Sequence, residues 1–90
     1  MTGETSKREA ALLEARRLIC VEREGEHGDP NIMFERAAKM WSGYLGVEVS
    51  PVQVCDLLTL LKMSRLSNNA EHHDSRVDAI GYLALGGEVV

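Results

Sequence analysis

The sequence predicts an all-α domain of about four helices, in an orthogonal or half-bundle arrangement that oligomerisation completes. Apolar residues recur at spacings of three and four over long stretches, which is the period of an amphipathic helix. Helix-start signals precede these stretches, and the one β-like run, Val47-Glu48-Val49, is too short and isolated to predict a sheet. The helices are expected at roughly 7–24, 31–45, 51–66 and 70–85.

Length and composition indicate one globular domain. Of the 90 residues, 44% are hydrophobic and 27% are charged, which is typical of a folded protein. We expect a disordered N-terminus at 1–5, a single helical domain at 6–87 and a short C-terminal tail at 88–90. A chain of this size buries only about 60–65% of the surface that its unfolded form exposes, so a homo-oligomer is expected.

Charge and cysteine usage exclude several classes of protein. The net charge of −4 disfavours DNA as a partner, because non-specific affinity for DNA comes largely from Lys and Arg. Cys20 and Cys55 stand singly within helical patterns, where cysteine packs as a small hydrophobic residue, and no disulfide framework is indicated. The polar N-terminus is unlike a signal peptide, and no apolar run approaches the ~20 residues of a membrane span. A cytoplasmic protein without a membrane partner is expected.

The first helix begins at a capping-box pattern formed by Ser6 and Glu9. Gly25 is expected to end it. Its buried stripe is predicted to consist of Ala11, Leu12, Ala15, Leu18 and Ile19.

The second helix is predicted to be capped by Asp29 or Asn31, with Pro30 in a first-turn position. Gly46 follows it at the place where a left-handed C-terminal cap is expected. Tyr44 is expected to be a packing residue. The predicted apolar face consists of Phe34, Ala37, Ala38, Trp41 and Leu45.

The third helix has the clearest start signal, with Ser50 as cap, Pro51 in the first turn and Gln53 completing the box. Other apolar residues surround its circumference, which is typical of a helix buried on most sides. Three short helices cannot cover so much surface, so this helix is expected at a subunit interface. One predicted face carries Val54, Leu57, Leu58 and Leu61, and the remaining apolar residues are Val52, Cys55, Leu60 and Met63.

The fourth helix is predicted to start at a cap formed by Asn68 or Asn69 and to end at Gly86-Gly87. Gly81 in mid-helix costs about 1 kcal/mol relative to alanine, which predicts a close approach of another helix there. Its packing face is expected to carry Val77, Ile80, Gly81 and Ala84.

Asp74 and Asp78 are the first candidates for chemistry. One helical turn separates them, so the two carboxylates project from the same side of the helix, about 6 Å apart at Cβ. Mg²⁺ is commonly bound by one or two carboxylates together with phosphates and water. Asp56 on the preceding helix is either a third metal ligand or a salt-bridge partner at an interface. In the alternative, Asp74 complements the helix dipole and Asp78 is solvated or paired with Lys or Arg.

Lys62 and Arg65 lie one turn apart near the end of the third helix. Three roles stay open for these two residues. They bind a phosphate group, pair with the two aspartates across the hairpin, or complement the negative C-terminus of their own helix. A zinc site is disfavoured, because no Cys-x-x-Cys or His-x-x-x-His spacing is present. His72 and His73 are expected at a solvated helix start, and neither cysteine has a neighbouring base that would make it a nucleophile.

Several runs resemble an uncharacterised family of small helical proteins found in tailed-phage and prophage genomes. The matching runs are 22–30, 34–41, 60–66 and 74–82, and the likeness covers about 18–87. Its most specific parts are a Leu-Leu-Lys-x-x-Arg run and an Asp-x-x-x-Asp-x-x-Gly-Tyr run. That family looks like a relative of the all-α, MazG-like nucleoside triphosphate pyrophosphohydrolases.

The resemblance implies a nucleotide or phosphate ligand bound with Mg²⁺. Asp78 would match the final acid of the second metal motif, Asp74 would replace the glutamate before it, and Lys62 and Arg65 would face the phosphates. Active members carry a Glu-Glu-x-x-Glu cluster on the partnering helix, which has no counterpart here. Glu35 and Asp56 are the isolated acids of the second and third helices, and Glu35 is assigned as an accessory acid.

Three functions therefore stay open. One is a Mg²⁺-dependent nucleotide-processing enzyme, in which the metal polarises the phosphoryl group and activates water. The second is a non-catalytic accessory protein that sequesters a nucleotide signal of host defence or binds a host protein, in the host cytoplasm if phage-encoded. The third is a purely structural helical module.

Overall fold

The computed structural model describes residues 5–22 and 28–90. These residues form four α-helices and one π-helical segment, and no strand occurs among them, so the predicted all-α class with four helices is confirmed. The expected helix end at Gly25 and most of the N-terminus assigned as disordered lie outside the described residues. The elements are α1 (Lys7–Arg16), η1 (Arg17–Glu22), α3 (Pro30–Leu45), α4 (Pro51–Asn68) and α5 (His73–Val89).

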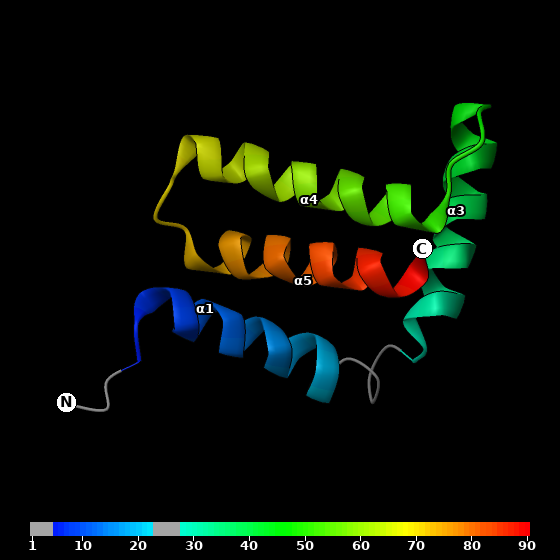
Figure 1. Ribbon diagram of the computed structural model, residues 1–90. Coiled ribbons are helices and arrows are strands. Elements are labelled where there is room, and N and C mark those ends of the chain that lie inside the picture. Colours follow the sequence, from blue (N-terminus) through cyan, green and yellow to red (C-terminus); the bar gives the residue numbers. More distant parts are fainter. Residues whose placement is uncertain (1–4, 23–27) are drawn as a thin grey trace.

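Helix α5 is the centre of the arrangement. Figure 1 shows α4 and α5 side by side as an antiparallel hairpin, with α1 along the other side of α5. Helix α3 crosses the end of this hairpin where α4 begins and α5 ends. Because α1 contacts α5 but neither α3 nor α4, the three roughly parallel helices lie in one layer.

The helix boundaries predicted from capping residues are largely confirmed. Ser50 and Gln53 form a reciprocal box, in which the Ser50 N–H donates to Gln53 Oε1 (2.9 Å) and the Gln53 N–H donates to Ser50 Oγ (3.2 Å). Asp29 rather than Asn31 caps α3, accepting the Asn31 N–H at 2.9 Å. Gly46 ends α3 in the left-handed conformation with φ 74°.

Helix α1 starts as predicted, with Ser6 Oγ accepting the Glu9 N–H at 3.1 Å. Its predicted buried stripe is too wide. Ala11 and Ala15 are buried, whereas Leu12 is 57% exposed. The reason is that α1 packs on α5 alone, so one narrow line of small residues meets its partner and both flanks face solvent.

Both ends of α5 differ from the prediction. Asn69 ends α4 and uses its Oδ1 to accept the Glu71 N–H in the connecting turn, so α5 starts after a different cap, His72. At the other end the helix continues through Gly86 and the residue after it to Val89, into the segment assigned to the tail. Gly86 is buried in the helix pair, where its backbone approaches α4, and it does not terminate the helix.

The main core lies where α3, α4 and α5 meet, and a smaller cluster joins α1 to α5. Where η1 meets α5, a Cβ added at Gly81 would lie 3.1 Å from Ile19 Cγ2, so the predicted close approach at this glycine is confirmed. The main core consists of Phe34, Ala38, Val49, Val54, Cys55 and Leu85, and the smaller cluster of Ala11, Ala15 and Val77.

The face that α4 buries is the predicted one only in part, since Val54 is buried and Leu58 packs against the core. Towards α5 the helix presents mainly small or polar residues, including Cys55 and Thr59. Leu57 and Leu61, which were expected in the core, are exposed. Leu57, Leu58 and Leu61 share a helical stripe with Val54, but α5 packs against the neighbouring side of α4, where small residues permit a close approach.

Three further packing predictions were wrong. Cys20 was expected in the core and is exposed, because only one side of η1 meets α5. Tyr44 and Leu45 were expected to pack and are both exposed, because the last turn of α3 extends past the hairpin.

Candidate functional site

The closest charged contact between helices in the described residues joins α4 to α5. Lys62 Nζ lies 2.9 Å from Asp78 Oδ2, and the two side chains are 15% and 37% exposed. The antiparallel hairpin places the two residues opposite each other, because α4 ends and α5 begins at the same turn. The ammonium group therefore neutralises the carboxylate that was predicted to bind metal.

Asp74 lies in the first turn of α5 and is exposed. An acid at this place is favoured by the positive end of the helix dipole. It is one turn before Asp78, as predicted, but the charge of Asp78 is already compensated by Lys62. Of the alternative predicted from spacing, the structure shows one part, the pairing of Asp78 with a lysine.

Asp56 is not part of the same group. Its Oδ1 lies 3.9 Å from the position that a Cβ would take at Gly86. Gly86 is eight residues beyond Asp78 on α5, which corresponds to about 12 Å along the helix. In residues 5–22 and 28–90, no three His, Cys, Asp or Glu side chains come together as a metal-binding group. The assignment of Mg²⁺ to Asp56, Asp74 and Asp78 stays a prediction.

The other predicted site residues are dispersed. Arg65 is exposed on α4, one turn after Lys62, and makes no ion pair with the residues that the structure describes. Glu35 lies on α3 and pairs with Lys39 at 3.4 Å on the surface. Since α3 crosses the hairpin where α4 begins and Lys62 lies in the second half of α4, Glu35 is remote from this cation.

His72 has a structural role that the sequence did not reveal. Its Nδ1 accepts the backbone N–H of Ser75 at 3.2 Å and lies 2.7 Å from Ser75 Oγ, which is buried. The same turn is closed by Arg76, whose guanidinium donates to the Ala70 carbonyl at 2.8 Å. The available signal was the spacing, because the side chain of a capping residue accepts the N–H of the residue two or three positions later. Histidine is an uncommon capping residue, so this signal was not recognised.

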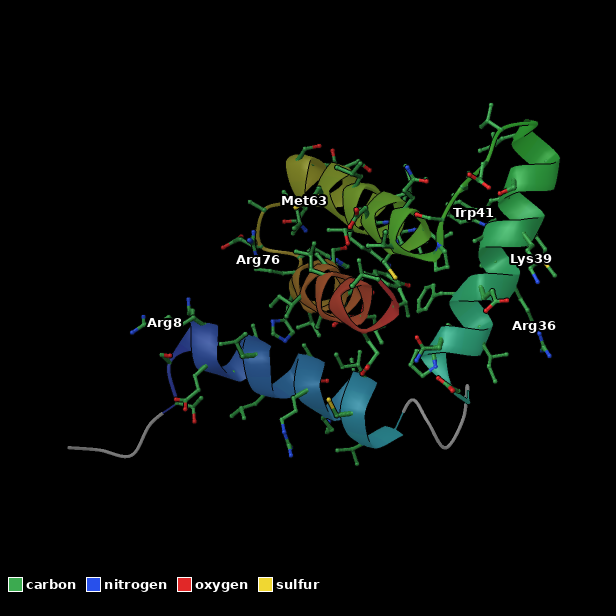
Figure 2. All side chains as sticks on the ribbon, turned by 45° about the vertical axis from the view of Figure 1, so that its right-hand side comes forward. Arg8, Arg36, Lys39, Trp41, Met63 and Arg76 are labelled. Atoms are coloured by element: carbon green, nitrogen blue, oxygen red, sulfur yellow. The ribbon has the colours of Figure 1, made fainter. Side chains whose placement is uncertain are left out.

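A large apolar surface is the feature that sequence reasoning located only in part. We call it the α3–α4 surface. Met40 and Tyr44 on α3 are 72% and 91% exposed. A hollow of about 530 Å³ lies between the last turns of α3 and the outer side of α4. In Figure 2 Trp41 lies on the side of α3 towards α4, whereas Arg36 and Lys39 extend from the other side. The surface consists of Met40, Trp41, Tyr44, Leu45, Leu57, Leu60 and Leu61.

The apolar character of α4 predicted a subunit interface, which stays a prediction, and three leucines of this helix are exposed. That prediction did not include the residues of α3: Trp41 packs against the core as expected, whereas Tyr44 was expected to pack and is exposed. As to membranes, no helix in the described ranges combines the length and apolar character that a membrane span requires.

Comparison with known proteins identifies the family. A family model described as a domain of unknown function (DUF6378) matches residues 10–90. The Gene 55 protein of Mycobacterium phage D29 is 40% identical over 74 residues, which cover 82% of this chain and 49% of that protein. The Gene 55 protein of Mycobacterium phage L5 is 38% identical over 75 residues, covering 82% and 48%. No solved structure matches.

The chain spans about half the length of these curated relatives. The predicted resemblance to a family of phage proteins is confirmed, whereas the further likeness to the MazG-like hydrolases is not confirmed and stays a prediction. Because the family model covers most of the chain, this protein belongs to the DUF6378 family, whose function its name leaves open.

Proposed function

We propose that this chain is a non-catalytic phage accessory protein that acts by binding another protein through the α3–α4 surface. The observation that carries the proposal is the exposure and apolar composition of that surface. The two relatives described above are phage proteins, which supports the phage setting. One alternative predicted from the sequence, an accessory protein that binds a host protein, is an example of this proposed function.

The α3–α4 surface is a contiguous patch and not a scatter of single apolar residues. Leu57 and Leu61 are one turn apart on α4, and Leu60 is beside them. Leu57 also lines the hollow shared with α3. Isolated exposed leucines are common on protein surfaces, but large contiguous patches mark sites of interaction.

The Lys62–Asp78 pair supports a role without catalysis. Metal-assisted hydrolysis of a nucleotide needs acids that hold a cation against the phosphates. In this hairpin a lysine lies where α4 faces Asp78, so the positive charge is supplied by the protein itself. We expect no pyrophosphate to be released from nucleoside triphosphates in the presence of Mg²⁺ or Mn²⁺. Release at a rate proportional to enzyme concentration would contradict the proposal.

The binding role is tested with the wild-type chain and the double variant Leu57→Glu/Leu61→Glu as baits in lysates of host cells, with and without phage infection. Proteins that are retained by the wild type and lost with the variant are identified by mass spectrometry and tested again as purified proteins. The matched control is Leu12→Glu, because Leu12 is an exposed leucine on α1, which does not contact α4. Equal retention by all three baits would refute the assignment of the surface.

A nucleotide or phosphate ligand is a second candidate, favoured by one observation. Arg65 is exposed one turn after Lys62 and has no ion-pair partner in the described part of the chain. An arginine in this position is free to bind a phosphate group bidentately. Calorimetry with nucleoside triphosphates, cyclic dinucleotides and inorganic phosphate tests it. Arg65→Ala should bind the ligand at least tenfold more weakly than the wild type does. If none of the three ligands gives a heat of binding with the wild type, this second candidate function is excluded.

A further inference from the structure

We infer that the protein bound to the α3–α4 surface is a second copy of this chain, related by a two-fold axis. The inference rests on the proposed function, because it names the partner of the same surface. Three properties of the molecule carry it: the area that the chain leaves exposed, the absence of charge from the surface, and its combination of a hollow with protruding side chains.

The chain exposes more surface than a self-sufficient monomer does. Its accessible surface is 6495 Å². A folded monomer of 9.9 kDa is expected to expose about 5200 Å². The excess, roughly 1300 Å², is of the order that one partner contributes to a standard protein interface, about 800 Å².

The shape gives the reason for this excess. The molecule measures 54 × 31 × 20 Å, and its Cα radius of gyration is 14.7 Å. A compact domain of this length is expected to have a radius of gyration of about 12 Å. Since a helix with its side chains is about 10–12 Å across, the smallest dimension is less than two helices thick. Stable domains pack their elements against one another around a core, and a second copy would cover the edge of the helix layer at α4.

The charge distribution favours a copy of the chain over an oppositely charged partner. Within the α3–α4 surface every residue is uncharged, although the whole chain has a net charge of −4. A two-fold contact places each side chain near its own counterpart or that of a neighbour in the other copy. Charges inside such a contact would face charges of the same sign, which is destabilising. An uncharged patch on an acidic protein avoids this cost.

The shape of the α3–α4 surface is self-complementary, because the surface has both a hollow and protruding side chains. The hollow at Leu57 lies at one end of the surface, and Leu60 and Leu61 project from α4 about one turn further along. In a two-fold contact the leucines of each copy can enter the hollow of the other. Both halves of the packing are thus present on one chain, which is the condition for an isologous interface.

Sedimentation velocity from 1 to 200 µM tests the inference directly. The wild type should change from a species of 9.9 kDa to one of twice that mass as its concentration rises. The double variant Leu57→Glu/Leu61→Glu should raise the dimer dissociation constant at least tenfold, and Leu12→Glu should leave it unchanged. Circular dichroism of each variant verifies that helix content is retained, so that loss of the dimer is not loss of the fold.

Hydroxyl-radical footprinting at the two ends of this concentration range locates the contact without any mutation. Oxidation of Met40 and Tyr44 should fall several-fold in the concentrated sample, whereas that of Leu12 should not change. A wild type that stays monomeric, or a dimer whose footprint and stability ignore the α3–α4 surface, overturns the inference. In the first case the proposed function still stands if a host or phage protein binds the wild type and not the double variant. If no protein binds the wild type in preference to the double variant, the proposed function is refuted together with the inference.

Discussion

The two sides of α4 differ in a way that reverses the usual relation between leucine content and burial. The buried side of α4 carries Val54, Cys55, Thr59 and one leucine, Leu66, together with the partly buried Lys62. The opposite side carries three leucines that remain in contact with solvent. Small residues let α4 and α5 approach closely, and Gly86 of α5 packs directly on Cys55. We call the side of α4 that meets α5 the inner side, and the side that carries Leu57, Leu60 and Leu61 the leucine side. The difference teaches that the inner side is specialised for intramolecular packing, whereas the leucine side has the composition of an interface.

The largest effect is expected at the inner core. Phe34 is 2% exposed and packs where α3 meets the hairpin, so Phe34→Ala should lower the free energy of unfolding by about 3–5 kcal/mol. Urea denaturation followed by circular dichroism measures this. A loss below about 1 kcal/mol would mean that α3 is not held by this core.

A second test introduces a larger side chain where α4 and α5 approach each other closely. A Cβ at Gly86 would lie 3.5 Å from Cys55 Cβ, so Gly86→Leu should force α4 and α5 apart and destabilise the fold by about 1–3 kcal/mol. Gly87→Leu is the matched control, because nothing lies within 4 Å of a Cβ built at Gly87. Thermal unfolding of the two variants side by side should show the loss for Gly86 alone, and equal midpoints would contradict the close approach.

The ion pair of the inner side should contribute less. Lys62→Ala removes the partner of Asp78, and partly exposed pairs of this kind contribute about 0.2–1 kcal/mol. Because the lysine occupies one side of Asp78, millimolar Mg²⁺ should not change the unfolding midpoint of the wild type. A rise of the wild-type midpoint with Mg²⁺ that is lost in Asp74→Asn/Asp78→Asn would instead support the metal assignment.

The smallest effect on folding is expected on the leucine side. Leu57→Ala should change the free energy of unfolding by less than about 0.5 kcal/mol when measured at 1 µM, where the chain is expected to be monomeric. At 200 µM the same variant should be less stable than the wild type, because dimerisation stabilises the folded state by mass action. Identical behaviour at the two concentrations would remove the distinction between the two sides of α4.

The candidate site was predicted less well than the fold. Spacing alone placed Asp74 and Asp78 on one side of a helix, and the option of pairing Asp78 with a lysine across the hairpin is what the structure has. Asp56 could not be placed from sequence, because its distance from the other acids depends on the register between α4 and α5. The α3–α4 surface was foreseen only through α4, since Tyr44 follows the same helical period as the buried residues of α3.

The sequence by itself determined the class of fold and most helix ends. These depend on local chemistry: Ser50 and Gln53 bond each other's backbone within four residues, and Gly46 adopts a left-handed conformation that other residues avoid. Only the tertiary structure decided which side of α4 is buried, because an all-round apolar helix fits several orientations and the small residues on α5 select one. It likewise decided that Gly86 continues a helix, since contact with Cys55 across the hairpin compensates for its low helix propensity.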